Sequence, residues 1–499
     1  MRTKKTFLNF ITDVVPLAII SFLGIYKLKI FINVLGNETL GLYQLYSQIM
    51  VYIALVDGGL GSALLYSLYK PNSSKDDEKF NAIIAGAYRI FALIGIIIFG
   101  ITLLASPFIS LFIKNSVFSN QYLMITFLCF SLSNIVEYFF VPYRTIFEVK
   151  EKKYIVNICL QVGQIILSGT EIIMLLLGFN FILILLMHSV IKLLSNIVIA
   201  ILCRKIYPNI KMNSKNRDYG FTKQLKHLVF HKINGLVSYN IDVIIISKIL
   251  GLASVAIYST YNYIINMFRN ILGKISSSLT AIIGNYLVTN NKEKTYSLYL
   301  EFNNLMFFIA TILCVPLFFA LNGFIDLWYD GKIETSIFLS LAFSIYLFVY
   351  IIKSPTTTFV TAAGLFKETK VCALTDTLIN LTLSILLVFK FGISGVIVAT
   401  TISVFIAEIC MKTNVVYKNI FSKKSFLYHV ENIKFVVITV LDVLIGLLLF
   451  NYISINNILI WFIVFSVYFI VNSLLVFLIY KIFGQAGFVN RLKSFKKEK

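Results

Sequence analysis

The stretch LGNETLGLY at residues 35–43 returns later in the chain as LGLASVAIY at residues 250–258. Both copies follow a long apolar run and share the pattern L-G-x4-[G/A]-x-Y at an offset of about 215 residues. Two further pairs keep nearly the same offset: FEVKEKKYIV at 147–156 with AAGLFKETKV at 362–371, and LGF at 177–179 with FGI at 391–393. The chain therefore contains an internal repeat.

The segments around these copies are those of a membrane protein. The chain has 499 residues, of which 58% are hydrophobic and 13% charged, about half the charge of an ordinary soluble protein. Many apolar runs reach the roughly 20 residues that cross a hydrocarbon core, and backbone groups in lipid must bond within their own segment. We expect an all-α integral membrane protein with about 14 helices, at about 8–32, 40–69, 80–105, 121–147, 154–177, 181–203, 222–249, 253–288, 296–321, 337–361, 371–390, 394–415, 433–453 and 457–482.

The distribution of basic residues supports this count. With both termini placed in the cytoplasm, the cytoplasmic segments hold 30 Lys and Arg and the outer loops hold 3. Basic loops stay on the cytoplasmic side, so the net charge of +21 indicates topology and not nucleic-acid binding. The offset of the repeat spans six helices, so both copies have the same orientation and are related by an axis along the membrane normal. We expect a six-helix bundle at 1–215, a second at 216–425, and two extra helices with a basic tail at 426–499.

Several motifs together resemble a known family. These are the repeated L-G-x4-[G/A]-x-Y element, VDGGLGSA at 56–63, FIDLW at 324–328 with Gly331, and AAG-x-x-K at 362–367. With the 12+2 helix pattern, they resemble the polysaccharide (Wzx-type) flippases of the multidrug/oligosaccharidyl-lipid/polysaccharide exporter superfamily. The resemblance covers residues 8–480.

The resemblance implies a transporter and not an enzyme. It would move a polyprenyl-diphosphate-linked oligosaccharide from the inner to the outer leaflet by alternating access, for capsule, O-antigen or exopolysaccharide assembly. It implies a bacterial cytoplasmic membrane, no cofactor, and a proton or sodium gradient as the candidate energy source. Membrane lipids and other glycan-assembly membrane proteins are candidate partners.

Two alternatives remain open. One is a cation-coupled drug or metabolite exporter of the same superfamily, whose cavity should be acidic or apolar. The other is a membrane glycan polymerase or glycosyltransferase, which would need a substantial outer loop. The longest outer loops, about 106–120 and 323–336, have only about fifteen residues, which counts against the enzyme.

The charged residues inside predicted spans are candidate site residues, because such residues are costly in lipid and usually face a wet cavity. The spans hold 11 basic and 8 acidic residues, an excess too small to prove an anionic substrate. Arg269 lies mid-helix beside Asn266 and Asn270, and an Arg fork matches phosphate geometry. It fits either a diphosphate ligand or a buried ion pair with Asp57.

The other candidates also have two interpretations each. Lys27 and Lys29 fit a cationic wall at a lateral gate, or a structural pair in which Lys27 meets its repeat counterpart Asp242. Lys353 shares a helix face with Tyr346 and Tyr350, whose rings stack on sugars; it fits cavity lining or snorkelling at the interface. Arg89 and Lys192 fit either cavity lining or snorkelling at the interface. Asp13 fits either ion coupling or a structural carboxylate near a helix N-terminus.

His227 and His231 share a helix face, but they lack a nearby third ligand, so we predict no metal site. None of the six cysteines forms a C-x-x-C pair, and we expect unpaired thiols.

Overall fold

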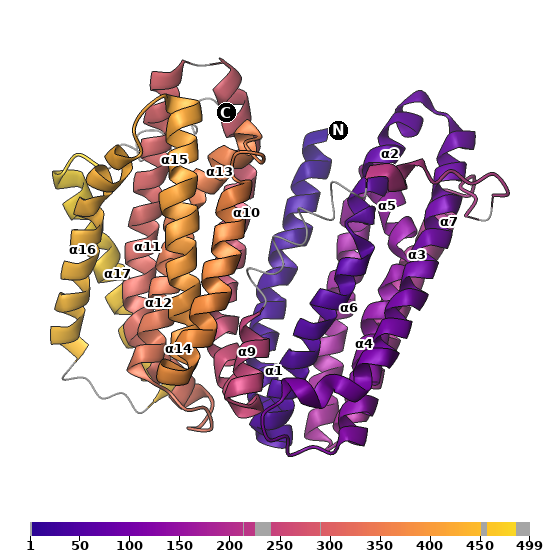
Figure 1. Ribbon diagram of the computed structural model, residues 1–499, viewed down its shortest axis with the longest axis horizontal. Coiled ribbons are helices and arrows are strands. Elements are labelled where there is room, and N and C mark those ends of the chain that lie inside the picture. The colour runs from indigo at the N-terminus through magenta and orange to yellow at the C-terminus, as the bar shows by residue number, and fades with distance from the viewer. Residues whose placement is uncertain (1, 213, 225–240, 290, 451–456, 486–499) are drawn as a thin grey trace. The chain divides into compact units, whose positions relative to one another are not determined.

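The computed structural model describes residues 2–212, 214–224, 241–289, 291–450 and 457–485 (Figure 1). Long helices joined by short connections make up this part of the chain, and no strand occurs in it. The all-helical membrane architecture is therefore confirmed. Within the described ranges, eleven helical segments are long and apolar enough to cross a membrane: Ile19–Asp57, Asp77–Phe112, Asn120–Val149, Lys153–Leu176, Phe181–Ile206, Leu252–Thr289, Lys292–Trp328, Ile337–Ala363, Lys370–Phe421, Phe426–Phe450 and Ile458–Ile482.

Three of the fourteen predicted helices have no separate counterpart among these eleven. Helix α1 (Arg2–Ile53) has 52 residues, or about 78 Å at 1.5 Å per residue, more than twice a hydrocarbon core. It is interrupted at Gly36, where φ is 81° and ψ is 169°. Helix α14 (Lys370–Val404) is likewise interrupted at Gly392. Each thus joins two predicted helices, and most of the predicted helix 222–249 lies outside the described residues.

The chain divides into two compact units, Met1–Ala256 and Ile257–Lys499. The first holds α1, η1 (Ala54–Asp57), α2 (Leu60–Ser74), α3 (Asp77–Ala105), η2 (Ser106–Phe112), α4 (Asn120–Tyr138), α5 (Val141–Val149), α6 (Lys153–Leu176), α7 (Phe181–Ile206), η3 (Gly220–Gln224) and α9 (Asp242–Ile249). In this unit α1 and α7 both pack on α6, and α4 packs on α7.

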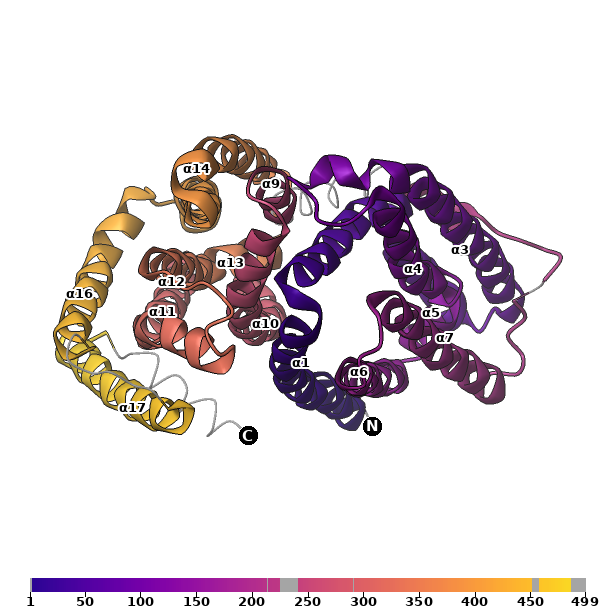
Figure 2. The ribbon, with the colours of Figure 1, turned by 90° about the horizontal axis from the view of Figure 1, so that it is seen from below.

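The second unit holds most of α10 (Leu252–Thr289), then α11 (Lys292–Trp328), α12 (Ile337–Ile352), α13 (Ser354–Ala363), α14, η4 (Phe405–Met411), α15 (Lys412–Val416), η5 (Tyr417–Phe421), α16 (Phe426–Phe450) and α17 (Ile458–Ile482). Figure 2 shows α16 and α17 as a layer beside α11, on which both pack. The predicted division at 215 and 425 concerns the sequence repeat and stays a prediction. The two units described above are defined by which residues pack together.

The repeat is visible in local backbone geometry. Gly36 and its counterpart Gly251 both have positive φ, 81° and 101°. Gly178 and Gly392, which also correspond, have φ of 76° and 58°. These four glycines stand at the ends of helices where the chain reverses, in a region of φ that side chains disfavour. The repeated glycines therefore mark equivalent turns in the two copies.

Several predicted helix ends differ from those in the structure. The predicted span 394–415 continues to Phe421, and two π-helical segments, η4 and η5, lie within it. Lys412 follows η4 inside this helix. π-Helical segments are frequent at functional sites.

We expect Gly36→Ala to lower the free energy of unfolding by about 1–3 kcal/mol, because the backbone there lies in a region that is essentially restricted to glycine. The melting temperature of the purified protein in detergent measures this. Gly100→Ala is the control, since its added methyl group meets open space in an ordinary helix and should leave stability unchanged or raise it. Equal melting temperatures for the two variants would contradict the expectation.

Candidate functional site

Arg269 lies half-buried on α10 in the second unit and faces two tyrosines of α12. Its guanidinium carbon is 4.5 Å from the ring centroid of Tyr350 and 5.4 Å from that of Tyr346. One of its Nη groups donates to Asn266 Oδ1 at 2.9 Å. The sequence prediction that these tyrosines share a face is confirmed by this arrangement, in which Arg269 is held against aromatic rings by cation–π contact.

Lys353 stands at the junction between α12 and α13, where Pro355 begins the next helix. Its Nζ lies 5.2 Å from the centroid of the Tyr350 ring and 3.9 Å from Glu408 Oε2. Arg269 and Lys353 therefore both contact the ring of Tyr350. A hydrogen bond of 2.5 Å between the hydroxyls of Ser276 and Ser354 joins α10 to α13 close to this point.

Glu408 lies in the π-helix η4 and is shared by two lysines. Lys412 Nζ approaches both carboxylate oxygens at 2.5 Å, and Thr357 donates to Oε2 at 3.3 Å. The side chains of Lys353 and Glu408 are each 7% exposed, and that of Lys412 is 12% exposed. Asp376 on α14 is also buried and close enough to interact with this group. We call Arg269, Lys353, Glu408, Lys412 and Asp376 the C-unit cluster; it has one excess positive charge with both carboxylates ionised.

The first unit contains a similar group around Glu137 at the end of α4. Glu137 Oε1 lies 3.0 Å from Lys192 Nζ, and Oε2 accepts from both Nη groups of Arg144 at 3.3 and 3.4 Å. Arg144 also donates from Nε and Nη2 to Asn196 Oδ1, at 3.1 and 2.5 Å. We call Glu137, Arg144, Lys192 and Asn196 the N-unit cluster.

The two clusters occupy equivalent places in the repeat, with the charges exchanged. Glu137 and Lys353 are 216 positions apart, and so are Lys192 and Glu408. In both units the pair joins the helix broken by proline, Pro142 or Pro355, to the sixth helix of the copy. In the first unit the carboxylate, Glu137, is on the broken helix, and in the second unit the carboxylate, Glu408, is on the sixth helix. The same two positions are therefore paired in both units, with the positive and negative residues exchanged.

Lys27 belongs to a third group, inside the first unit. Its Nζ lies 3.0 Å from Glu171 Oε2, and His188 Nε2 lies 3.1 Å from the same oxygen. Glu171 is buried between α1 and α7. Lys27 is thus paired with Glu171 within its own unit. The sequence repeat, which aligned Lys27 with Asp242, did not identify this partner.

The remaining predicted residues are more scattered. Lys29 is half-buried on α1 and Arg89 is exposed on α3. Asp57 ends η1 and accepts from the Gly59 N–H at 2.8 Å, while Asp242 is buried at the start of α9. Asp13 lies in α1, among side chains that the structure does not describe, and the pair His227 and His231 lies outside the described residues. A pairing of Arg269 with Asp57 would join the two units and stays a prediction.

A sequence profile for a family described as "Polysaccharide biosynthesis protein" matches residues 17–284, more than half of the chain. The chain belongs to this family. A comparison with curated proteins finds no match. The assignment to this family therefore rests on the sequence profile.

Solved structures show which fold this polysaccharide biosynthesis protein has. A lipid II flippase, MurJ, in an inward closed conformation has a TM-score of 0.72 and 17% identity, over 94% of this chain and 98% of MurJ. An inward-facing multidrug resistance transporter of the MATE family has a TM-score of 0.61 and 15% identity, over 80% and 96%. A transporter from Pyrococcus furiosus, described as having a binding pocket of reverse polarity, has 0.53 and 15%, over 79% and 92%. The shared feature at these identities is the fold of the superfamily.

Sequence patterns missed the partners that define all three groups. His188 is 17 residues from Glu171, and Asn196 is 52 residues from Arg144. At such separations neither partner carried a signal in the sequence. The equal offset of Glu137–Lys353 and Lys192–Glu408 was a usable signal, since it required only comparison of charges between the two copies.

We expect Glu408→Gln to destabilise this polysaccharide biosynthesis protein by about 3–5 kcal/mol, because two buried lysines would lose their counter-charge. The control is Glu148→Gln, which removes a pair with Lys153 whose side chains are 35% and 53% exposed and should cost about 0–1 kcal/mol. Thermal unfolding in detergent measures both. A loss in the control as large as that in Glu408→Gln would refute the structural role of this carboxylate.

Proposed function

We propose that this protein is a flippase that moves a polyprenyl-diphosphate-linked oligosaccharide from the inner to the outer leaflet by alternating access. Membership of the polysaccharide biosynthesis family supports a role in glycan assembly. The fold, shared with a lipid II flippase and with multidrug transporters, supports transport over catalysis. The protein is accordingly no enzyme in this proposal.

The observation that carries the proposal is the C-unit cluster. A diphosphate has at least two negative charges, and its transfer through hydrocarbon requires positive groups to replace water. Arg269 is the half-buried cation of this cluster, held against the rings of Tyr346 and Tyr350. Because the ring faces are already engaged with cations, the tyrosines orient Arg269 and do not need to stack on sugar.

Lys353 contributes differently in this proposal. Its side chain is 7% exposed and faces Glu408, so direct contact with a bound diphosphate requires movement. In the conformation described it adds positive potential close to the Tyr350 ring, in a buried place where low dielectric strengthens charge interactions. The predicted roles of Lys27 and Lys192 are weaker, since each faces a carboxylate at 3.0 Å.

The rest of the proposal follows from the family. The protein would lie in a bacterial cytoplasmic membrane with both termini in the cytoplasm, as the basic loops indicate. A proton or sodium gradient would reset the units without a bound cofactor. Other glycan-assembly membrane proteins would supply and consume the lipid-linked substrate.

Deletion in the native host, followed by extraction of lipid-linked intermediates, tests the substrate class. We expect undecaprenyl-diphosphate-linked glycan to accumulate on the inner leaflet, and a plasmid copy to restore surface glycan. Unchanged intermediates together with increased sensitivity to cationic drugs would contradict the flippase and support the exporter.

We expect Arg269→Ala to reduce transport at least about tenfold, equivalent to roughly 1.4 kcal/mol, with normal insertion. Arg269→Lys should be intermediate, because lysine keeps the charge and loses the bidentate fork. The rate at which surface glycan is restored in the deletion strain is the measurement. Lys274→Ala, an exposed position on the same helix, is the control and should retain activity. Full activity in Arg269→Ala would remove this residue from the site.

A further inference from the structure

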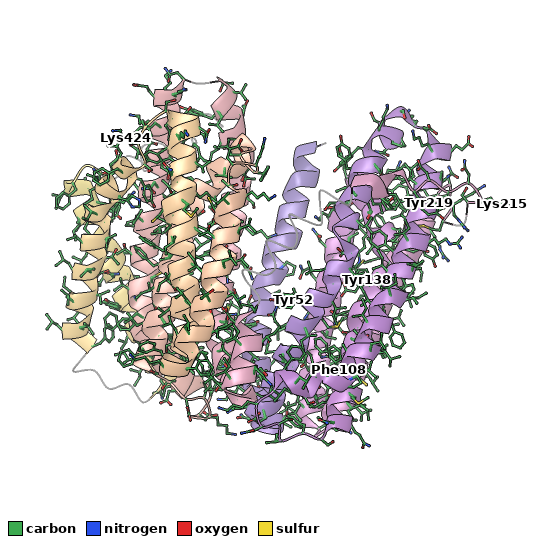
Figure 3. The ribbon with its side chains drawn as sticks, in the orientation of Figure 1. Tyr52, Phe108, Tyr138, Lys215, Tyr219 and Lys424 are labelled. Carbon is green, nitrogen blue, oxygen red and sulfur yellow. The ribbon has the colours of Figure 1, made fainter. Side chains whose placement is uncertain are left out.

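A cleft of about 320 Å³ with a mixed polar and apolar lining opens in the first unit beside the N-unit cluster. Its polar lining consists of Ser47, Asp57, Asn134, Glu137, Tyr138 and Arg144. Figure 3 places Tyr138 midway along this unit, between Phe108 near one end and Tyr219 near the other. The cleft therefore lies about midway along the helices of this unit.

The charges around this cleft are balanced. Asp57 and Glu137 supply two carboxylates, and Arg144 and Lys192 supply two cations. The C-unit cluster, in contrast, has an excess of positive charge. The cleft offers both hydrogen-bond donors and acceptors, which a molecule rich in hydroxyls can use together.

The cleft also differs from its repeat counterpart in exposure. The side chains of Arg144, Lys192 and Glu137 are 20%, 28% and 36% exposed, whereas those of Lys353, Glu408 and Lys412 are 7%, 7% and 12% exposed. An ion pair whose only role is to hold two helices together can be either buried or partly exposed. Glu137 and Arg144 line the cleft, which distinguishes their ion pair from the buried pair of the second unit.

The polar groups of the cleft are held in fixed positions. Asn196 is buried and accepts two hydrogen bonds from Arg144, which leaves the guanidinium aimed at Glu137. Glu137 in turn is fixed by Arg144 and Lys192 and keeps further lone pairs on both oxygens. Such preorganisation lowers the entropy cost of binding, and the ring of Tyr138 provides an apolar face of the kind that packs on a sugar.

We propose that this cleft binds one sugar residue of the glycan carried by the transported lipid. This inference rests on the proposed function and assigns recognition of a sugar to the first unit. The volume corresponds to about ten waters at roughly 30 Å³ each, a space that one pyranose ring fits. Glu137 and Asn134 accept from sugar hydroxyls, and Arg144 donates to them.

The test compares two probes on purified protein in detergent. One is the lipid-linked glycan that accumulates in the deletion strain, and the other is undecaprenyl diphosphate without sugar. We expect Glu137→Gln and Asn134→Ala each to weaken binding of the glycan lipid about tenfold, the effect of losing a strong hydrogen bond. Both variants should bind the sugar-free lipid within about twofold of the unaltered protein, whereas Arg269→Ala should weaken both probes alike.

Asn134→Ala matters because it leaves the Glu137 ion pairs untouched, so its effect does not depend on their contribution to folding. Glu148→Gln, in an exposed pair of the same unit, is the matched control for lost charge and should bind both probes normally. Equal weakening of both probes in the cleft variants, or no weakening of either, would overturn the sugar site while leaving the flippase intact. Failure of the unaltered protein to bind either probe would overturn the proposed function, and the sugar site with it.

Discussion

The constraint on which this structure depends is the cost of a charge inside a membrane. Taking an ion out of water costs several kcal/mol even after relaxation, and the chain meets this cost by giving each of three carboxylates two basic partners. Glu137 has Arg144 and Lys192, Glu171 has Lys27 and His188, and Glu408 has Lys353 and Lys412. Every group joins helices that are distant in sequence. The ion pairs that neutralise the charges therefore also hold these helices together.

The same arrangement produces a division of polarity between the units. Each copy of the repeat keeps an ion pair at the same two positions. The residues around that pair differ between the two copies. In the second unit the Lys353–Glu408 pair is buried, and Arg269 lies half-buried against the ring of Tyr350. In the first unit Glu137 and Arg144 line a cleft of mixed polarity.

The helical membrane fold could be predicted from the sequence because apolar length and backbone hydrogen bonding determine it almost alone. The turns at Gly36 and Gly251 could be found because their conformation restricts the residue type. Partners of the buried charges could not be found, since Lys27 and Glu171 are 144 residues apart and nothing in either segment specifies the other.

The central claim is that the protein itself lets a lipid-linked glycan change leaflets. Vesicles that contain the glycan lipid, with and without the purified protein, measure this directly through the fraction of glycan accessible to a membrane-impermeant reagent over time. The account predicts that vesicles with protein expose nearly all of the glycan, while protein-free vesicles stay near half. Identical exposure in the two preparations, with an ion gradient of either sign applied, would contradict it.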